Sequence, residues 1–188
     1  KAAAYDGFDE ETDAELLERL LFKVRQPATS GNKNHYIIWA TNVDGVGGVK
    51  VLPLWNGNGT VKVIITDAEN EIASEDLIAK VQNYIDEQRP IGATVTVVSP
   101  KPLNIDISLK VTKGSGNIDG IKNAVNDFFK TTAFKSEYVS YAQVGKVILE
   151  KAATGVQDYS DLTLNNQTEN IVLTDEQLPT VGQVNLIE

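Results

Sequence analysis

A strict alternation of apolar and polar residues between Leu103 and Val111 constrains the fold more than any other stretch of this 188-residue chain. Five apolar residues occupy every second position there, and polar residues separate them. Because successive side chains of a strand point to opposite faces, this pattern predicts a strand with one buried face. Just before it, Ser99-Pro100-Lys101-Pro102 contains two prolines, which interrupt both helices and strand ladders. We therefore predict a domain boundary here, with a flexible connection.

The residues before this boundary alternate between helical and strand-like patterns. Apolar residues at helical spacing predict one helix after Thr12, a second over residues 32–43 and a third after Ser74. Between the second and third helices, two alternating runs flank Asn56-Gly57-Asn58-Gly59, a composition typical of a β-hairpin turn. A short strand just before the boundary completes the order α-α-β-β-α-β for residues 12–99.

The residues after the boundary predict a second unit of similar size. The alternating strand is followed by a helix capped by Asn117, and a further helix opens at the capping box Ser140-x-x-Gln143. With the strands that follow, the order is β-α-α-β-β for residues 100–188. The predicted class is α+β, with two small α/β sandwich domains that each pack helices on one face of a short mixed or antiparallel sheet.

Acidic residues gather at the N-terminus, where residues 1–11 are expected to form an acidic arm before the first domain. The chain carries a net charge of −9, so its field repels phosphate backbones and anionic lipid, and we expect neither nucleic-acid nor membrane binding. Two interpretations of the acidic cluster stay open: a solvated arm with an acidic first helical turn, or a docking surface for a basic partner. On the second interpretation, the interface candidates are Asp6, Asp9, Glu10, Glu11 and Asp13.

The chain lacks cysteine, so it has no disulfide, thiolate metal site or cysteine nucleophile. No apolar run approaches the ~18–20 residues that span a bilayer. Because the chain begins at Lys1 and contains no methionine, we expect it to be part of a longer translated protein.

The residues that could carry chemistry do not form a recognisable site. His35 is the only histidine, and it lies in a helix rich in tyrosine and tryptophan, which favours a structural role. The acidic run from Asp67 to Glu71 has oxygens at alternate positions, as in a calcium loop, but Ile72 stands where that loop requires glycine. The glycines from Gly45 to Gly48 lack the spacing of a phosphate-binding loop. We expect no catalytic residue, no metal, no cofactor and no enzymatic activity.

The two tryptophans have different expected roles. Trp39 lies on the apolar stripe of its predicted helix, which indicates core packing. Trp55 stands beside the Asn/Gly turn of the predicted hairpin. Two roles remain as alternatives for it: packing at the edge of the core, or anchoring a protein–protein interface. Trp55 is therefore a further interface candidate.

A series of motifs, in this order and spacing, resembles the baseplate J-like family, whose members are wedge proteins of contractile phage tails and related injection machines. The motifs are Asp13-Ala-Glu-Leu-Leu-Glu-Arg, Pro27, Gly31-Asn32, Tyr36-Ile-Ile-Trp39-Ala40, Gly45-Val46, Val51-Leu-Pro53-Leu-Trp55, Gly57-Asn-Gly59-Thr60-Val61 and Arg89-Pro90-Ile-Gly92-Ala93. The resemblance covers about residues 12–111 and points to the C-terminal portion of such a protein.

The resemblance implies a structural role in a phage or prophage tail baseplate, through contacts with other wedge proteins and a second copy of the chain. It also implies a location in the virion after assembly in the bacterial cytoplasm. The alternative from another class is a small α+β ligand-binding or regulatory module. A closed pocket with perturbed polar groups favours that alternative, whereas a shallow surface with an apolar patch favours assembly.

Overall fold

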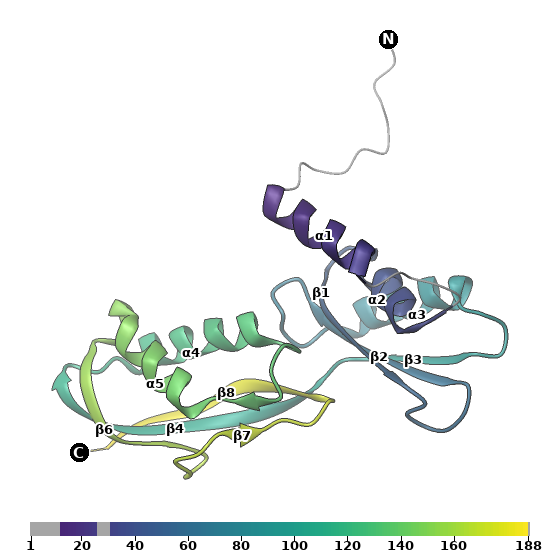
Figure 1. Cartoon of the computed structure of the whole chain (residues 1–188). Helices are drawn as coiled ribbons and strands as arrows, with labels where there is room; N and C mark the ends of the chain where they lie inside the picture. The colour runs from purple at the N-terminus through teal and green to yellow at the C-terminus, as the bar shows by residue number, and fades with distance from the viewer. Residues whose placement is uncertain (1–11, 26–30, 188) are drawn as a thin grey trace.

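Two small sheets lie side by side in the computed structural model, which describes residues 12–25 and 31–187, and helices cover one face of each sheet (Figure 1). Helix α1 (Asp13–Arg25) stands away from both sheets. Each sheet has three strands and contains both parallel and antiparallel pairs. The predicted α+β class, with helices on one face of a short mixed sheet in each of two domains, is confirmed.

The first domain places two helices on a sheet with the strand order β1-β2-β3. Strand β2 pairs antiparallel with β1 and parallel with β3. Pro53 ends β1, an edge strand, where its missing N–H removes no interior ladder bond. The elements are α2 (Lys33–Thr41), β1 (Val46–Pro53), β2 (Thr60–Asp67), α3 (Glu75–Gln88) and β3 (Thr94–Val98).

The helices of this domain begin where side chains satisfy exposed backbone donors. The Asn32 side chain accepts from the His35 N–H at 3.0 Å, and Ser74 Oγ accepts from the Leu77 N–H at 3.3 Å. Fully buried apolar side chains join the helices to the sheet, and each valine or isoleucine among them contributes roughly 1.5–3 kcal/mol by leaving water. The fully buried members are Ala40, Val51, Val63, Ile65, Val81 and Ile85.

The second domain has the strand order β6-β4-β8, with β4 antiparallel to β6 and parallel to β8. A separate two-stranded ribbon joins β5 to β7. Its elements are β4 (Lys101–Gly114), α4 (Ile118–Thr132), β5 (Tyr138–Val139), α5 (Tyr141–Glu150), the 3-10 turn η1 (Ala152–Thr154), β6 (Val156–Leu164), β7 (Ile171–Val172) and β8 (Gln177–Ile187).

The alternating stretch of the sequence forms the centre of this second core. Ile105, Ile107 and Leu109 of β4 are fully buried and pack with apolar residues of α4 and α5. Helix α4 lies close to η1 at Gly120, where an added Cβ would meet the Ala153 carbonyl oxygen at 1.9 Å. Any larger residue at this position would push the helix away from the turn.

The connection between the domains is more regular than the prolines predict. Strand β4 begins at Lys101, so the expected flexible connection is wrong for this half of the motif. Pro102 pairs with Leu178 of β8, whereas β6 joins β4 only from Ile107 onward. Proline fits there because β4 has a neighbour on one side only. Pro100 is buried, and Ser99 Oγ accepts a hydrogen bond from the Ala73 N–H at 3.0 Å.

Candidate assembly surfaces

Three large apolar side chains are exposed at one end of the first domain: Leu54, Trp55 and Ile91, which we call the tip patch. Leu54 and Trp55 begin the β1–β2 turn, and Ile91 lies in the α3–β3 loop. The loops meet because the Thr94 N–H donates to the Gly59 carbonyl at 2.8 Å. Exposed apolar side chains on adjoining loops are typical of a contact surface.

The β1–β2 turn is held in one conformation by Thr60. Its Oγ1 donates to the Gly57 carbonyl at 2.7 Å and accepts from the Asn56 N–H at 3.0 Å, while its own carbonyl accepts from the Leu54 N–H at 2.7 Å. Leu54 adopts a φ of 57°, a left-handed conformation that costs a non-glycine residue free energy. The turn therefore presents Trp55 at a defined place.

Trp55, an interface candidate from the sequence, is 41% exposed, and one face of its ring is covered by Lys62. The Lys62 ammonium lies 3.8 Å from the ring centroid, a favourable contact between a cation and the negative ring face. The ring is thus anchored on one face and available on the rest.

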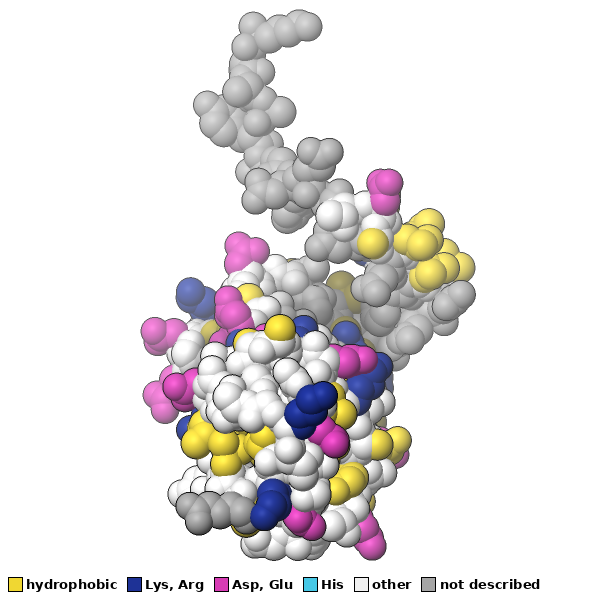
Figure 2. Space-filling view, turned by 90° about the vertical axis from the view of Figure 1, so that its left-hand side faces the viewer, with side chains coloured by type: hydrophobic (Ala, Val, Ile, Leu, Met, Phe, Trp, Pro, Cys, Tyr) yellow, Lys and Arg dark blue, Asp and Glu magenta, His cyan; other side chains and the backbone are white. Residues whose placement is uncertain are grey.

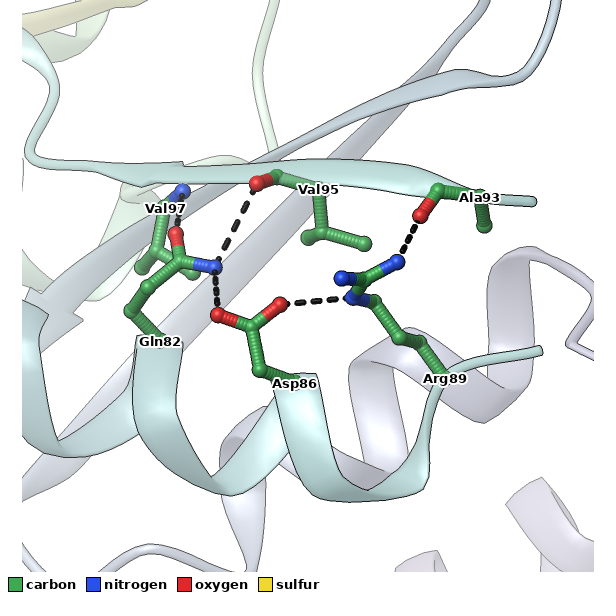
Figure 3. A network of polar contacts seen from close by, with 6 residues as sticks. All are labelled: Gln82, Asp86, Arg89, Ala93, Val95 and Val97. Atoms are coloured by element: carbon green, nitrogen blue, oxygen red, sulfur yellow. Dashed lines mark hydrogen bonds and ion pairs between the residues drawn. The ribbon is translucent and has the colours of Figure 1, made fainter. Parts of the chain in front are cut away.

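The outer edge of the first sheet, which β3 forms, is covered by side chains of α3 and of Arg89 just after it (Figure 3). Gln82 accepts from the Val97 N–H at 2.8 Å and donates to the Val95 carbonyl at 3.3 Å, and Arg89 Nη1 donates to the Ala93 carbonyl. Asp86 joins the two, and the hydrogen bonds from Gln82 and Arg89 hold the pKa of Asp86 below its ordinary value. These bonds satisfy the outer edge of β3, so that edge is blocked against another strand.

Helix α1 exposes an apolar stripe. Figure 2 shows yellow side chains gathered on this helix, and its exposed members are Leu16, Leu17, Leu20 and Val24. The helical spacing of Leu17, Leu20, Leu21 and Val24 predicts this helix, and in the structure Leu17, Leu20 and Val24 of this set are exposed. Asp13, the first residue of α1, is also exposed. The other acidic candidates, Asp6, Asp9, Glu10 and Glu11, lie outside the described residues.

His35 packs against its neighbours in and before α2. Its ring stacks on Trp39 with centroids 4.5 Å apart, and its Nδ1 accepts from the Gly31 N–H at 3.1 Å. Trp39 in turn meets Tyr36 edge-on at 5.1 Å, and burial raises the pKa of the Tyr36 hydroxyl. Both aromatic rings belong to the first core, which places His35 in a packing role.

The acidic run that resembled a calcium loop forms a turn closed by its own backbone. Asp67 Oδ1 accepts from the Glu69 and Glu71 N–H groups at 3.1 and 2.7 Å. Glu71 pairs instead with Lys130 of the second domain at 2.8 Å. Among residues 12–25 and 31–187, no group of three or more His, Asp or Glu side chains is arranged to hold a metal.

Two small hollows lie on the described surface. One, of about 250 Å³, lies between α4 and the β5–β7 ribbon, and its lining includes Phe128 and Tyr138. A second, of about 270 Å³, lies between the domains beside Glu71 and Lys130. The hydrogen bond between these two groups lowers the pKa of Glu71 and raises that of Lys130. Within the described part of the chain, no helix is long and apolar enough to cross a bilayer.

Comparison with known proteins identifies both domains. Residues 28–99 match the baseplate J-like central domain, and residues 103–187 match the baseplate J-like protein C-terminal domain. These matches define a protein with two consecutive baseplate-type α+β domains. The chain belongs to the baseplate J-like family, as its motifs indicated.

The relatives include proteins of phages and prophages. The chain is 42% identical to the phage-like element PBSX protein XkdT of Bacillus subtilis over 97% of its own length and 55% of that protein. It is 28% identical to baseplate protein gp47 of Escherichia phage Mu, over 95% of its own length and 52% of that protein. The chain thus spans about half the length of these relatives.

A solved structure has a similar fold. A chain in the cryo-EM structure of the anti-feeding prophage (AFP) baseplate matches 92% of this chain and 42% of its own length, with a TM-score of 0.57 and 16% identity. At this identity the likeness shows the fold alone.

Of the tip patch, the sequence pointed to Trp55 and missed Leu54 and Ile91. Their signal was the presence of large apolar residues next to glycine and proline in turns, where core residues are uncommon.

Proposed function

We propose that this chain is a structural component of a contractile phage-tail baseplate. It acts as part of a wedge protein, through contacts with neighbouring baseplate proteins and with a second copy of itself. The observation that carries the proposal is the match of two consecutive baseplate J-like domains over most of the chain. The names of the relatives support the same assignment, since one of them is a baseplate protein of phage Mu.

The tip patch supports an assembly role on physical grounds. Large apolar and aromatic side chains at the centre of a contact contribute most of its binding free energy once water is excluded. Trp55 combines a fixed position with 41% exposure, and Leu54 and Ile91 are further exposed apolar side chains on the same two loops. Asp13, the exposed first residue of α1, would add charge complementarity toward a basic neighbour.

The described surface gives less support to a ligand-binding module. Pockets for small molecules are concave and mostly enclosed, with ~300–1,000 Å³ of volume. The two hollows described above are smaller. The polar groups with shifted pKa values beside the second one, Glu71 and Lys130, are already paired with each other.

The proposal places the protein in the baseplate of the virion or of a tail-like particle, after assembly in the bacterial cytoplasm. Deletion of the gene in its native host tests it. We expect particles without functional tails by electron microscopy, and restoration by the wild-type gene. Intact, contractile particles formed without the gene would contradict the proposal.

A complementation series tests the tip patch separately. Trp55→Ala in the full gene should fail to restore assembly, while Tyr138→Ala, a matched control with 47% exposure in the second domain, should restore it. Circular dichroism and the midpoint of thermal unfolding must show that both variants fold. If Trp55→Ala restores assembly, Trp55 is not needed for the contact, and the proposed baseplate role is unaffected.

A further inference from the structure

Charged side chains of opposite sign face one another across the junction between the two domains. Lys50 of β1 pairs with Asp175 at 2.7 Å, and Lys62 of β2 pairs with Glu176 at 2.5 Å. In the reverse sense, Glu71 of the first domain pairs with Lys130 of α4 at 2.8 Å. Among residues 12–25 and 31–187, these three ion pairs join the two domains.

The acidic partners lie on a turn that belongs firmly to the second domain. Asp175 and Glu176 precede β8, where the Lys101 N–H donates to the Glu176 carbonyl at 2.8 Å and the Gln177 N–H donates to Thr174 at 3.1 Å. Lys101 also pairs with the Glu176 carboxylate at 3.2 Å. A turn held in this way moves with the second sheet, so its pairs with Lys50 and Lys62 connect two rigid bodies.

Lys62 is the buried member of this group. It is 8% exposed, lies beneath the Trp55 ring, and its ammonium reaches Glu176. The Glu176 side chain is 30% exposed, so the pair lies at the margin of the junction, but removing the carboxylate would still leave the mostly buried ammonium without its partner. The hydrogen bonds from Lys62 and Lys101 lower the pKa of Glu176.

Apolar side chains also meet at the junction. Ile64 is fully buried on the strand face that it shares with Lys62, opposite Val63 and Ile65. Gly48 approaches the Phe134 ring, where an added Cβ would lie 3.1 Å away. Among the described residues, no helix or strand of one domain packs extensively on an element of the other.

We propose that these three ion pairs form a salt-sensitive latch that holds the two domains at one angle. When the pairs are broken, the second domain swings relative to the first while both cores stay folded. The latch does not depend on the proposed baseplate function, since it concerns the chain in isolation. Ion pairs suit this purpose because salt screens the more exposed ones, Lys50–Asp175 and Glu71–Lys130, whereas apolar packing is not weakened in this way.

The absence of cysteine makes the angle directly measurable. Spin labels at Glu87→Cys on α3 and Asn123→Cys on α4, both exposed positions, report the distance between the domains by double electron–electron resonance. We expect one narrow distance distribution at low salt. In 1 M NaCl, where the screening length is about 3 Å, the distribution should broaden.

Substitutions separate the latch from general salt effects. Glu176→Gln should broaden the distribution at low salt and make cleavage near the junction by a protease roughly tenfold faster, because the junction opens more often. Glu150→Gln is the matched control, since it removes an exposed pair with Lys146 inside α5 and should change neither measurement.

A charge exchange gives the decisive comparison, and it remains usable if Glu176→Gln does not fold. Glu71→Lys should broaden the distribution, Lys130→Glu should do the same, and the double variant should restore the narrow one. A distribution that stays narrow in 1 M NaCl and in both single variants would overturn the latch and assign the angle to the contacts of Ile64, Pro100 and Phe134.

Discussion

The two domains share an architecture but distribute their exposed apolar residues differently. In the first domain, Leu54, Trp55 and Ile91 lie on two loops that are hydrogen-bonded to each other, and Ile72 is exposed elsewhere, beside the second domain. In the second domain, the exposed apolar residues are spread over α4, β5, α5, β7 and β8. Scattered apolar residues are ordinary on any surface, whereas a cluster on a fixed turn marks a contact site. The difference points to the first domain as the one that carries the tip contact.

Within the first domain, the outer edge of the sheet is covered by side chains, whereas the tip is exposed. Gln82 and Arg89 occupy the backbone groups along the outer edge of β3, which prevents uncontrolled strand pairing. The tip patch, at the end of the same sheet, has no such cover over Leu54 and Ile91. On the proposed assembly role, association would use side chains at the tip and not the backbone of this edge.

The largest effects are expected from the cores, and they test whether the two domains unfold independently. Ile107→Ala in the second core and Ile85→Ala in the first should each cost about 2–5 kcal/mol of unfolding free energy, since both residues are fully buried. Both tryptophans lie in the first domain, so their fluorescence during urea unfolding reports that domain, while circular dichroism reports both. We expect Ile107→Ala to shift the circular dichroism transition and leave the fluorescence midpoint unchanged. If the circular dichroism and fluorescence midpoints shift together, the two domains unfold as one cooperative unit. That result would contradict the predicted domain boundary between residues 99 and 100.

A smaller loss of stability is expected from a substitution at the outer edge of β3, which side chains of α3 and of Arg89 cover. Arg89→Ala removes the bonds to Asp86 and to the Ala93 carbonyl, which should lower the unfolding free energy by about 1–3 kcal/mol. The same variant should associate more at high concentration, because part of the edge becomes free for another strand. Analytical ultracentrifugation measures this. Lys80→Ala, an exposed position on the same helix, is the control and should behave like the wild type.

The ion pairs between the domains predict a loss of stability in acid. Hydrogen bonds from lysines lower the pKa values of Glu71 and Glu176 in the folded chain. A lowered folded pKa stabilises the protein above the unfolded value of about 4.3, and this contribution is lost as pH falls through the folded value. We therefore expect the unfolding free energy to fall below pH ~4.3. Glu176→Gln should flatten this part of the profile, whereas Glu87→Gln should leave it unchanged.

The smallest effect is expected at His35. Its contacts are a stacked ring and one backbone hydrogen bond, so His35→Asn should lower the unfolding free energy by about 1 kcal/mol or less. Particle assembly in the complementation series should be unaffected. A defined activity that disappears with the fold preserved would contradict the structural role assigned to this histidine.

The helices and strands whose limits depend on residues close together in the chain could be predicted from the sequence. The alternation from Leu103 to Val111 gave the buried strand β4, and Ser74, Asn117 and Ser140 marked helix starts, where their side chains accept the expected backbone bonds. Trp55 could be named because a tryptophan beside an Asn/Gly turn is unusual. Capping and strand alternation act within a few residues, so the sequence alone determined them.

The contacts between distant segments were decided only by the tertiary structure. Lys62 and Glu176 are 114 positions apart, and nothing local relates them. The Pro100-Lys101-Pro102 motif predicted a flexible connection, yet β8 pairs with its second half and makes it a strand. Ile91 joins the tip patch only because β3 lies beside β2. The sequence determines which residues can form a strand or an ion pair, and the order of strands in the sheets determines which of them meet.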